Sequence, residues 1–484
     1  MKKTAAVRTR LRLWPPRRLL VLGLLPLWVA GCISSAGLGP TATRLEASQV
    51  AAESAFTAWP DEHWWQVFGD PELDRLIELA LVANPDLELA RARIEQADAA
   101  VGLTHSRLLP QLSFGVDTTY QRYSEHKLFP DSVAGSQDLD STVEFKGSYE
   151  FDFFGRNHAA VAAATSARRA SLAAQQAARV AVATHVAHVY FELARYVGDR
   201  EVVADTRRQR EKILKLVQAR VALGLDSNVE LRQAEGALPQ IDGEIALLDE
   251  NIALMRSALA ELAVIDPATT ASLTPSLNTV VAPVLPGAIP SDLLARRADI
   301  SAARWRIEAS LRGTDLIKAE FYPSVNLTVF GGIGALGLAS LFEAGSGLYG
   351  VSPSLRLPVF DGDRLRSQLK LASAEVDRAI AEYNHSLLAA VADVVHTVTS
   401  LRALEQRQAA QVAAQAAAES AYGIALQRYQ AGLTGYLTVL ATESDVLAQR
   451  RAATALKARA LSLNVDLDHA LGGGFNAAAP TASN

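Results

Sequence analysis

Two histidines, His185 and His188, form the best-spaced pair of potential metal ligands in the sequence. Residues three apart share one face of a helix, so such a pair could bind a transition metal. No paired cysteines and no H-E-x-x-H motif accompany them. Nor does the sequence contain a G-x-S-x-G, a P-loop or a dinucleotide-binding fingerprint in its required context. We interpret the pair as chance spacing on a helix surface and predict no metal, no catalytic residue, no cofactor and no enzyme activity.

Cys32 is the only cysteine, and it ends a segment typical of an export signal. Residues 2–18 are cationic and residues 19–30 form an apolar run that is too short to span a membrane. The sequence Val29-Ala30-Gly31-Cys32 resembles the lipobox of bacterial lipoproteins. This resemblance implies removal of residues 1–31 and a covalent lipid on Cys32, with an N-acyl chain such as palmitate and an S-diacylglycerol. By resemblance to enterobacterial sorting rules, Ile33 after the cysteine, rather than an Asp, favours sorting to the outer membrane over the inner membrane. An ordinary secretory signal with a chance cysteine is the alternative.

The composition of the 484-residue chain indicates long packed helices. Hydrophobic residues make up 49% of the chain but aromatic residues only 6%, so alanine supplies much of the apolar content. The net charge of −5 shows no basic excess, which argues against nucleic acid as a partner.

Residues 142–153 alternate almost strictly between charged or polar and apolar side chains. Such alternation predicts a β-strand with one wet and one apolar face, about 40 Å long. Gly155 ends the pattern, and an alanine-rich helix follows at once. If the strand lies in a membrane, charged residues should face an aqueous lumen, because on the lipid side each would cost about 2–4 kcal/mol. The predicted lumen-facing set comprises Asp117, Glu144, Lys146, Glu150 and Asp152. A soluble sandwich with one wet face is the alternative.

The same order of elements occurs twice, which predicts a duplicated helix–strand–strand–helix–helix unit. A lipid-anchored tether, residues 32–58, precedes the first repeat and a flexible tail, residues 472–484, follows the second. The first repeat, residues 59–272, should contain strands at about 111–121 and 142–153 and long helices at about 154–222 and 227–264. The second repeat, residues 273–471, should contain strands at about 324–330 and 348–358 and long helices at about 361–431 and 434–470. Residues 331–347 are expected to form a mobile glycine-rich loop.

Four strands cannot close a barrel, and an open sheet edge is not tolerated in lipid. Other copies of the chain must therefore complete the sheet. Three copies would give an allowed barrel of twelve strands, although the number three does not follow from the sequence.

The chain resembles the outer-membrane factor (TolC-like) family, in particular the NodT-type efflux lipoproteins. The resemblance rests on the lipobox and on four further segments: WWQVFGDPELDRLIELALVANPDLELARARIEQA, YEFDFFGR, LRLPVFDGDR and RYQAGLTGYLTVL. It implies a mainly α fold with a membrane β part. In that fold, a trimeric twelve-stranded outer-membrane β-barrel continues into a long periplasmic α-helical barrel. It also implies a homotrimer in outer-membrane lipid, joined through a periplasmic adaptor (membrane fusion protein) to an inner-membrane RND pump.

The resemblance also points to the helical tips, where Gly224 and Gly432 stop the long helices. In the family these turns meet the adaptor. Leu437 matches a tip leucine, but Ala441 stands where relatives often carry an acidic gate residue. Glu443 and Asp445 are nearby candidates for a gate. The sequence therefore does not predict a ring of carboxylates at this position.

The sequence predicts a passive outer-membrane exit duct for small molecules or drugs in a tripartite efflux pump. Two other readings stay open: an outer-membrane channel for type I protein secretion, and, less favoured, a periplasmic adaptor lipoprotein. An adaptor would need a β-rich lipoyl-like segment and would lack hairpins of membrane length.

Overall fold

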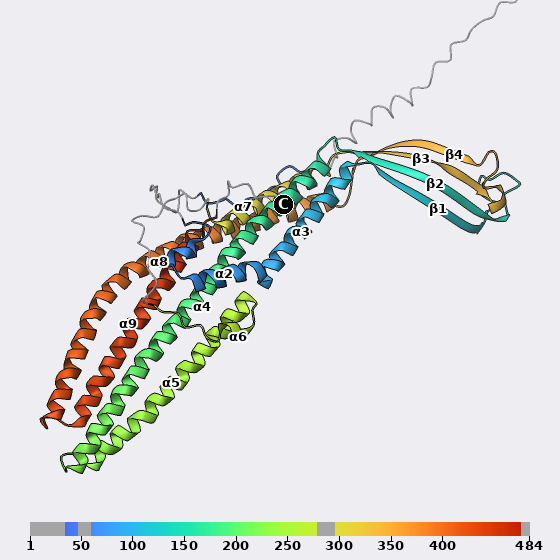
Figure 1. The fold of residues 1–484 in the computed structure, drawn as a ribbon. Coiled ribbons are helices and arrows are strands. Elements are labelled where there is room, and N and C mark those ends of the chain that lie inside the picture. Colours follow the sequence, from blue (N-terminus) through green and yellow to red (C-terminus); the bar gives the residue numbers. More distant parts are fainter. Residues whose placement is uncertain (1–33, 47–59, 278–295, 476–484) are drawn as a thin grey trace, which may run out of the picture. The chain divides into compact units, whose positions relative to one another are not determined.

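The computed structural model describes residues 34–46, 60–277 and 296–475 (Figure 1). The export signal, Cys32 and residues 476–484 of the tail lie outside the described residues. The tether is described over residues 34–46 only.

The described elements follow the duplicated order that the sequence predicts. The first set is η2 (Trp64–Phe68), α2 (Pro71–Ala83), α3 (Pro85–His105), η3 (Ser106–Leu108), β1 (Gln111–Arg122), β2 (Gln137–Phe151), α4 (Arg156–Ala222), α5 (Asn228–Ala263) and α6 (Pro267–Thr270). The second set is α7 (Ala298–Ala319), β3 (Ser324–Leu336), η5 (Leu338–Ser340), β4 (Gly347–Arg356), α8 (Arg364–Gln430) and α9 (Tyr436–Ala470). The series α3-β1-β2-α4-α5 recurs as α7-β3-β4-α8-α9, which confirms the duplication.

The chain divides into two compact units. One comprises residues 1–42, 99–165 and 308–378 and contains all four strands; we call it the strand unit. The other comprises residues 43–98, 166–307 and 379–484 and contains only helices among its described elements; we call it the helical unit.

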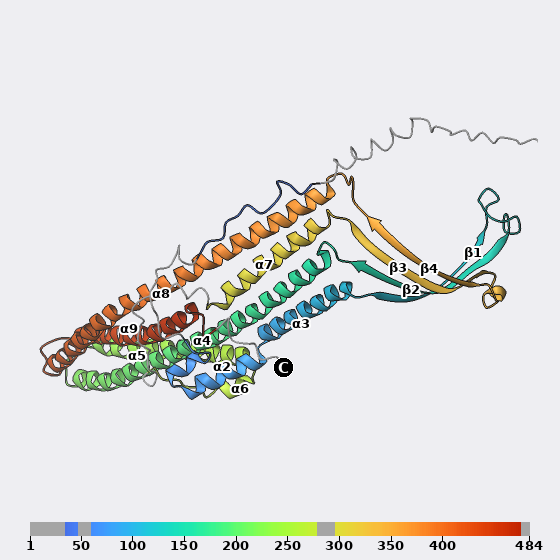
Figure 2. The ribbon, with the colours of Figure 1, turned by 90° about the horizontal axis from the view of Figure 1, so that it is seen from above.

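In the strand unit, β1, β2, β3 and β4 form one antiparallel sheet in sequence order (Figure 2). β2 begins at Gln137, five residues before the predicted start, because it pairs with the whole length of β1. The loop predicted from Gly331 was wrong for its first six residues, which extend β3 to Leu336. Gly332 allows this pairing, because a Cβ atom there would lie 2.1 Å from the Val143 carbonyl oxygen.

Local sequence signals set the helix boundaries in the helical unit. The Asp70 carboxylate accepts hydrogen bonds from the backbone N–H groups of Glu72 and Leu73, which caps α2 ahead of its first-turn proline. Ser227 and Glu230 form a capping box at the start of α5. Such caps pair backbone groups that a helix end would otherwise leave without a partner.

An aromatic core holds the helical unit together. Trp64, Trp65 and Phe68 of η2 pack with α2 against Tyr190 and Phe191 of α4. The Phe68 and Phe191 rings meet edge to face, with centroids 5.1 Å apart. Residues of α5 and α9 complete the same core: Ile252, Leu259, Ala263, Leu461 and Val465.

Candidate functional site

The register of the sheet separates its charged and apolar side chains onto opposite faces. Ser113 lies opposite Lys146, and Asp117 lies opposite Thr142, so the polar residues of β1 and β2 share one face. Phe114 lies opposite Phe145 on the other face. Asp117, Glu144, Lys146 and Glu150 therefore lie together on the face we call the polar face.

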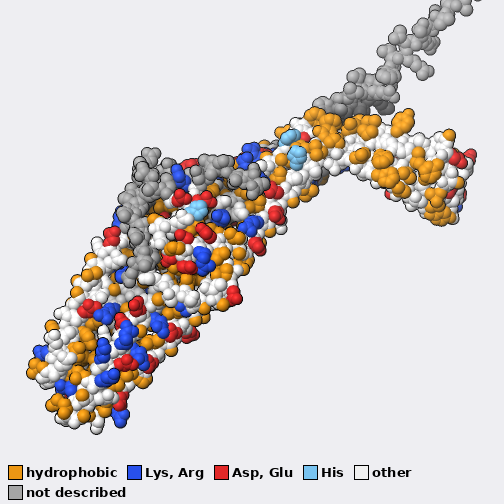
Figure 3. Space-filling model, in the orientation of Figure 1, with side chains coloured by type: hydrophobic (Ala, Val, Ile, Leu, Met, Phe, Trp, Pro, Cys, Tyr) orange, Lys and Arg blue, Asp and Glu red, His pale blue; other side chains and the backbone are white. Residues whose placement is uncertain are grey.

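The other face, which we call the apolar face, presents exposed hydrophobic side chains. Phe145 is 57% exposed and Tyr349 is 90% exposed in the single chain. Other members of this face are Leu112, Phe114, Val116, Val351 and Leu355. Figure 3 shows hydrophobic side chains gathered over the strands, whereas Lys, Arg, Asp and Glu are spread over the helices. A continuous apolar surface on a sheet requires either a protein partner or lipid.

Two hydrophobic side chains interrupt the polar face where glycines leave room for them. The Phe330 ring covers Gly350, where a Cβ atom would lie 2.5 Å from Cζ of the ring. Leu348 covers Gly334 in the same manner, with its Cδ2 atom 2.7 Å from the position of such a Cβ. These pairs fill the space that glycine leaves in a strand and thereby fix the register.

Asp152 does not belong to the strand face predicted for it. β2 ends at Phe151, and the Asp152 carboxylate accepts hydrogen bonds from the backbone N–H and the ring of His158 near the start of α4. Burial disfavours the charged carboxylate, but these hydrogen bonds outweigh it and lower the pKa of Asp152. The alternating pattern could not reveal this position of Asp152, because it does not show that the strand stops one residue earlier. An acidic side chain is instead favoured near a helix N-terminus.

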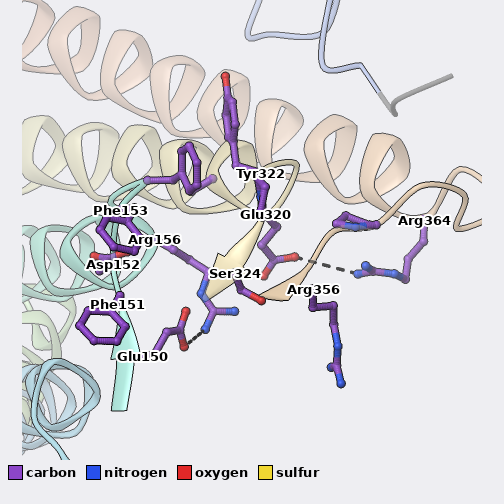
Figure 4. A pocket seen from close by; sticks show the side chains of 14 residues that line it. Glu150, Phe151, Asp152, Phe153, Arg156, Glu320, Tyr322, Ser324, Arg356 and Arg364 are labelled. Carbon is purple, nitrogen blue, oxygen red and sulfur yellow. Dashed lines mark hydrogen bonds and ion pairs between the residues drawn. The ribbon is translucent and has the colours of Figure 1, made fainter. Parts of the chain in front are cut away.

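A pocket lies where the strands of this unit meet its helices (Figure 4). Its charges are balanced by ion pairs: Arg156 lies 2.7 Å from Glu150, and Arg364 lies 4.0 Å from Glu320. Arg356 and Asp152 also line it, which makes three cations and three carboxylates in all. A mixed-charge lining of this kind favours no single sign of ligand charge.

Aromatic rings surround the same junction. Phe154 stacks on Tyr322, with ring centroids 4.9 Å apart, and Phe151 stacks on Phe153 at 5.7 Å. Phe360, in the segment between β4 and α8, is also exposed. Rings gathered at one level are typical of the interface between a membrane and water.

At the tips of the helical unit, the two predicted glycine turns are present. Gly224 follows α4 with φ +70° and Gly432 follows α8 with φ +76°, the left-handed conformation that glycine adopts without strain. Leu437, at the start of α9, is 63% exposed. Further exposed leucines flank the turns: Leu223, Leu225 and Leu433.

The two candidate gate carboxylates lie in different environments. Asp445 is exposed, whereas Glu443 is only 2% exposed. The Arg210 guanidinium of α4 donates hydrogen bonds to Glu443 of α9 at 2.8 Å and to the Ala237 carbonyl oxygen of α5 at 3.0 Å. Burial raises the pKa of Glu443, although the pairing with Arg210 acts in the opposite direction. Arg210 therefore links α4 to both α5 and α9, and Glu443 is held in this link instead of presenting a free carboxylate to an opening.

Sequence reasoning missed a second polar link at the tips. Arg220 donates to Asp226 at 2.9 Å, and the Tyr429 hydroxyl of α8 donates to the same carboxylate. The Arg220 guanidinium also lies over the Tyr429 ring, 4.6 Å from its centroid. Burial opposes the charged form of Asp226, but the bonds from Arg220 and Tyr429 prevail and lower its pKa. The sequence signal that could have revealed this link is the pair Arg220 and Asp226, which flank the Gly224 turn.

The two histidines singled out in the sequence do not belong to a cluster of three or more potential metal ligands among the described residues. The His188 Nε2 atom of α4 lies 2.9 Å from the Asp466 carboxylate of α9. Within the described ranges, no group of three or more His, Cys, Asp or Glu side chains has the arrangement of a metal site. Among the described helices, α8 alone is long and apolar enough to cross a membrane by length and composition, and only a third of its most apolar window is buried.

Comparison with known proteins relates nearly the whole chain to one group. Residues 76–263 and 289–473 match the family described as "Outer membrane efflux protein". The chain is 31% identical to the pyoverdine export outer membrane protein OpmQ of Pseudomonas putida, over 90% of this chain and 92% of that protein. It is also 31% identical to the multidrug resistance outer membrane protein MdtP of Escherichia coli, over 87% and 88%. The crystal structure of VceC from Vibrio cholerae matches with a TM-score of 0.81 and 36% identity, over 86% of this chain and all of that one.

Proposed function

Since the chain belongs to the outer membrane efflux protein family, we propose that it is the exit duct of a tripartite efflux pump. Its matches include a pyoverdine exporter and a multidrug resistance protein, both of the outer membrane. The duct acts passively and not as an enzyme, because the sequence carries no nucleotide-binding motif with which to energise transport. The observation that carries the proposal is the four-stranded sheet with one polar and one apolar face.

The sheet also supports assembly into a homotrimer. β1 and β4 are its edge strands, so each has one strand neighbour in a single chain. In lipid, every backbone N–H and C=O must be paired, and only a closed barrel achieves this with strands. Pairing of β4 with β1 of the next copy gives twelve strands from three chains, an even number of the kind that outer-membrane barrels use.

In that barrel the apolar face contacts lipid and the polar face lines the lumen. Asp117, Glu144, Lys146 and Glu150 are then lumen residues, and Tyr349 and Phe145 contact lipid. The opposite orientation would place four charged side chains per copy in hydrocarbon. Each would cost about 2–4 kcal/mol near the midplane, which decides the orientation.

At the helical tips, the exposed leucines and the glycine turns present a surface for the periplasmic adaptor, which joins the duct to an inner-membrane RND pump. Leu437 and Asp445 are the exposed candidates for the gate. Helices α4 and α5 form one hairpin, and α8 and α9 form the other. The links Arg210–Glu443 and Tyr429–Asp226 hold these two hairpins together in the described conformation. Opening would require the hairpins to realign at these links.

A lipid on Cys32 would anchor the chain to the outer membrane. The first described residue, Ser34, lies two positions after the cysteine, and the Arg366 guanidinium of α8 donates to its carbonyl oxygen at 2.5 Å. Asp377 accepts hydrogen bonds from the backbone N–H groups of Thr41 and Ala42, both at 2.8 Å. These bonds tie the segment that follows the anchor to the first third of α8.

Small molecules are the proposed substrates, and export of proteins is the second candidate. Efflux is favoured because OpmQ and MdtP are named for pyoverdine export and for multidrug resistance.

Planar-bilayer recording of the purified protein tests the channel, and cross-linking tests the trimer. Thr119→Cys on β1 combined with Ser352→Cys on β4 should yield dimers and trimers with a short bismaleimide. Ser148→Cys on the central strand β2, combined with Ser352→Cys, is the matched control and should stay monomeric. A protein that never conducts, even with Leu437 replaced by Ala, would refute the duct.

A further inference from the structure

Asp377 of α8 binds the main chain of the segment that follows the predicted lipid anchor. Its carboxylate accepts hydrogen bonds from the backbone N–H groups of Thr41 and Ala42, both at 2.8 Å, and from the Thr41 hydroxyl at 3.0 Å. These hydrogen bonds, the one from Ala42 foremost, lower the pKa of Asp377, so the carboxylate is charged at neutral pH. A charged acceptor makes stronger hydrogen bonds than a neutral one. Asp377 is therefore a binding site for two consecutive backbone N–H groups.

Arg366, nearer the start of the same helix, holds the other end of this segment. Its guanidinium donates to the Ser34 carbonyl oxygen at 2.5 Å. Arg366 and Asp377 are eleven residues apart in the sequence, which is about three helical turns, or roughly 16 Å along one face of α8. Residues 34–42, which we call the strap, therefore run beside the first turns of α8, as the dark blue trace in Figure 2 shows. Both contacts lie within the strand unit.

Polar contacts, rather than apolar packing, hold the strap on the helix. Most of its residues are exposed, and only Ser35 and Leu38 are half-buried. Gly37 turns the chain with φ +76°, and the Leu38 N–H donates to the Ser35 carbonyl oxygen at 3.2 Å. Little apolar area is therefore removed from water when the strap docks. Loss of the contact with Asp377 should free this segment without disturbing a core.

The docked strap places its anchor end where the helix meets the sheet of the same unit. β4 ends at Arg356, and α8 begins at Arg364, two residues before Arg366. Ser34 is two residues after Cys32 in the sequence, and two residues of extended chain reach about 7 Å. An undocked chain of the strap's length would instead have an r.m.s. end-to-end distance of about 15–18 Å and no fixed direction. Docking therefore decides how closely a lipid follows this junction.

We propose that Asp377 is a positioning residue that docks the strap and thereby holds a lipid on Cys32 beside the junction of α8 with the sheet. The inference rests on the proposed lipid anchor and deepens it. A short, fixed connection gives the sheet a higher effective concentration at the membrane surface than a long, flexible one. The docked strap therefore speeds insertion of the strand unit into lipid, whereas an undocked strap leaves the lipid and the sheet loosely connected.

Hydrogen exchange of the full-length protein in detergent tests the docking. Asp377→Ala should speed exchange of the Thr41 and Ala42 amides by about tenfold or more, because both lose a charged acceptor. The Leu45 amide should keep its rate, since its acceptor in the helical unit is the Asn384 side chain, at 2.9 Å. Unchanged exchange of the first two amides would show that Asp377 does not hold the strap.

Folding from urea into phosphatidylcholine vesicles, followed by the appearance of heat-stable trimer on gels, tests the positioning role. The comparison sets Asp377→Ala against the wild type, both in the lipidated protein and in a form without lipid. The form without lipid has Cys32→Ser behind a conventional secretory signal. Removing the lipid should slow folding severalfold, and Asp377→Ala should slow the lipidated protein by a similar factor. In the form without lipid, Asp377→Ala should change nothing.

Glu375→Ala is the matched control, because Glu375 is an exposed carboxylate two residues away on α8. It should retain the parent rate with and without the lipid. Equal slowing by Asp377→Ala in both forms would mean a purely structural role for Asp377. No slowing of the lipidated protein would mean that docking is irrelevant to insertion. Either result overturns the proposal.

Mass spectrometry of the N-terminal peptide keeps the anchor and the positioning role apart. A wild-type chain without lipid on Cys32 would refute the anchor, and the positioning role with it. A lipidated chain whose folding rate does not respond to Asp377→Ala would overturn only the role of Asp377. Once folded, Asp377→Ala trimers should conduct as the wild type does in planar bilayers. Absence of any conductance in the wild-type protein would instead refute the duct itself.

Discussion

Two carboxylates of the polar face and two carboxylates at the helical tips lie in opposite environments. Asp117 and Glu144 lie on an open face without an ion-pair partner among the described residues, whereas Glu443 is buried beside Arg210 and Asp226 is half-buried beside Arg220. In the single chain, the first group lies on a face open to solvent. The second group uses its charge to join helices. The same kind of side chain therefore faces solvent in one region and joins helices in the other.

The comparison also shows which change should do most harm. Removing a charge from the polar face leaves its neighbours solvated, but removing one from a buried pair leaves the partner charged and dehydrated. The variants below test this difference, beginning with the largest expected effect.

Glu443→Ala should destabilise the helical unit by about 3–5 kcal/mol, because Arg210 would stay buried without its partner. Denaturant unfolding of the full-length protein in detergent, followed by helical circular dichroism, measures the effect. The exposed carboxylate change Asp445→Ala should shift stability by less than about 0.5 kcal/mol. Adding Arg210→Leu to Glu443→Ala should restore part of the loss, and failure to do so would argue against a pairwise origin.

Phe145→Lys on the apolar face should weaken folding into lipid by about 2–4 kcal/mol, since the ammonium would face hydrocarbon. Urea titration of the protein folded into lipid vesicles gives this value. Ser148→Lys, three residues along β2 on the polar face, is the matched control and should be nearly neutral. Equal losses in the two variants would contradict a difference between the faces, and a larger loss for Ser148→Lys would mean that the faces have been assigned the wrong way round.

Asp226→Asn should loosen the turn between α4 and α5 by about 1.5–3 kcal/mol, the range for hydrogen bonds to a charged group. The pKa of Asp226 is lowered below its ordinary value of 3.8, so its contribution is complete above pH 3.8 and fades as acid protonates it. Hydrogen exchange of residues 223–227 should therefore accelerate in strong acid in the wild-type protein. The variant should exchange rapidly at neutral pH and lack this acid response.

Gly332→Ala should cost about 1–3 kcal/mol, because the new methyl group would collide with the Val143 carbonyl oxygen of β2. Gly331, its neighbour on the opposite face, has open space at the position of a Cβ atom. Gly331→Ala should therefore be tolerated. Similar trimer yields from the two variants in an outer-membrane preparation would contradict the observed strand register.

Arg200→Gln should have the smallest effect, about 0.2–1 kcal/mol, since its ion pair with Asp249 is on the surface between α4 and α5. Thermal unfolding at low and high salt measures it, and the difference from the wild-type protein should shrink as salt rises. If Arg200→Gln lost as much stability as Glu443→Ala, buried and exposed ion pairs would not differ in their contribution to stability.

Sequence reasoning recovered the strand faces because a strand repeats every two residues, and Asp117 and Glu144 fall on the same parity as their neighbours. It recovered the tips because Gly224 and Gly432 end long helices in both repeats. It could not find Arg210–Glu443 or Tyr429–Asp226, whose members are separated by 233 and 203 residues. Such pairs depend on how helices lie side by side, which no local pattern encodes. The extension of β3 past Gly331 was missed because glycine normally weakens a strand, and here the approach of Val143 reverses that preference.

The sheet has a consequence before the protein ever reaches its membrane. A single chain in water exposes Phe145 and Tyr349 on one face and unpaired backbone groups along the outer edges of β1 and β4. Both features promote self-association, and native sheets usually cover or interrupt them. Pro353 within β4 removes one backbone donor from that strand, a modest safeguard. Between export and insertion, the newly made chain should therefore be prone to self-association until the apolar face and the strand edges are covered.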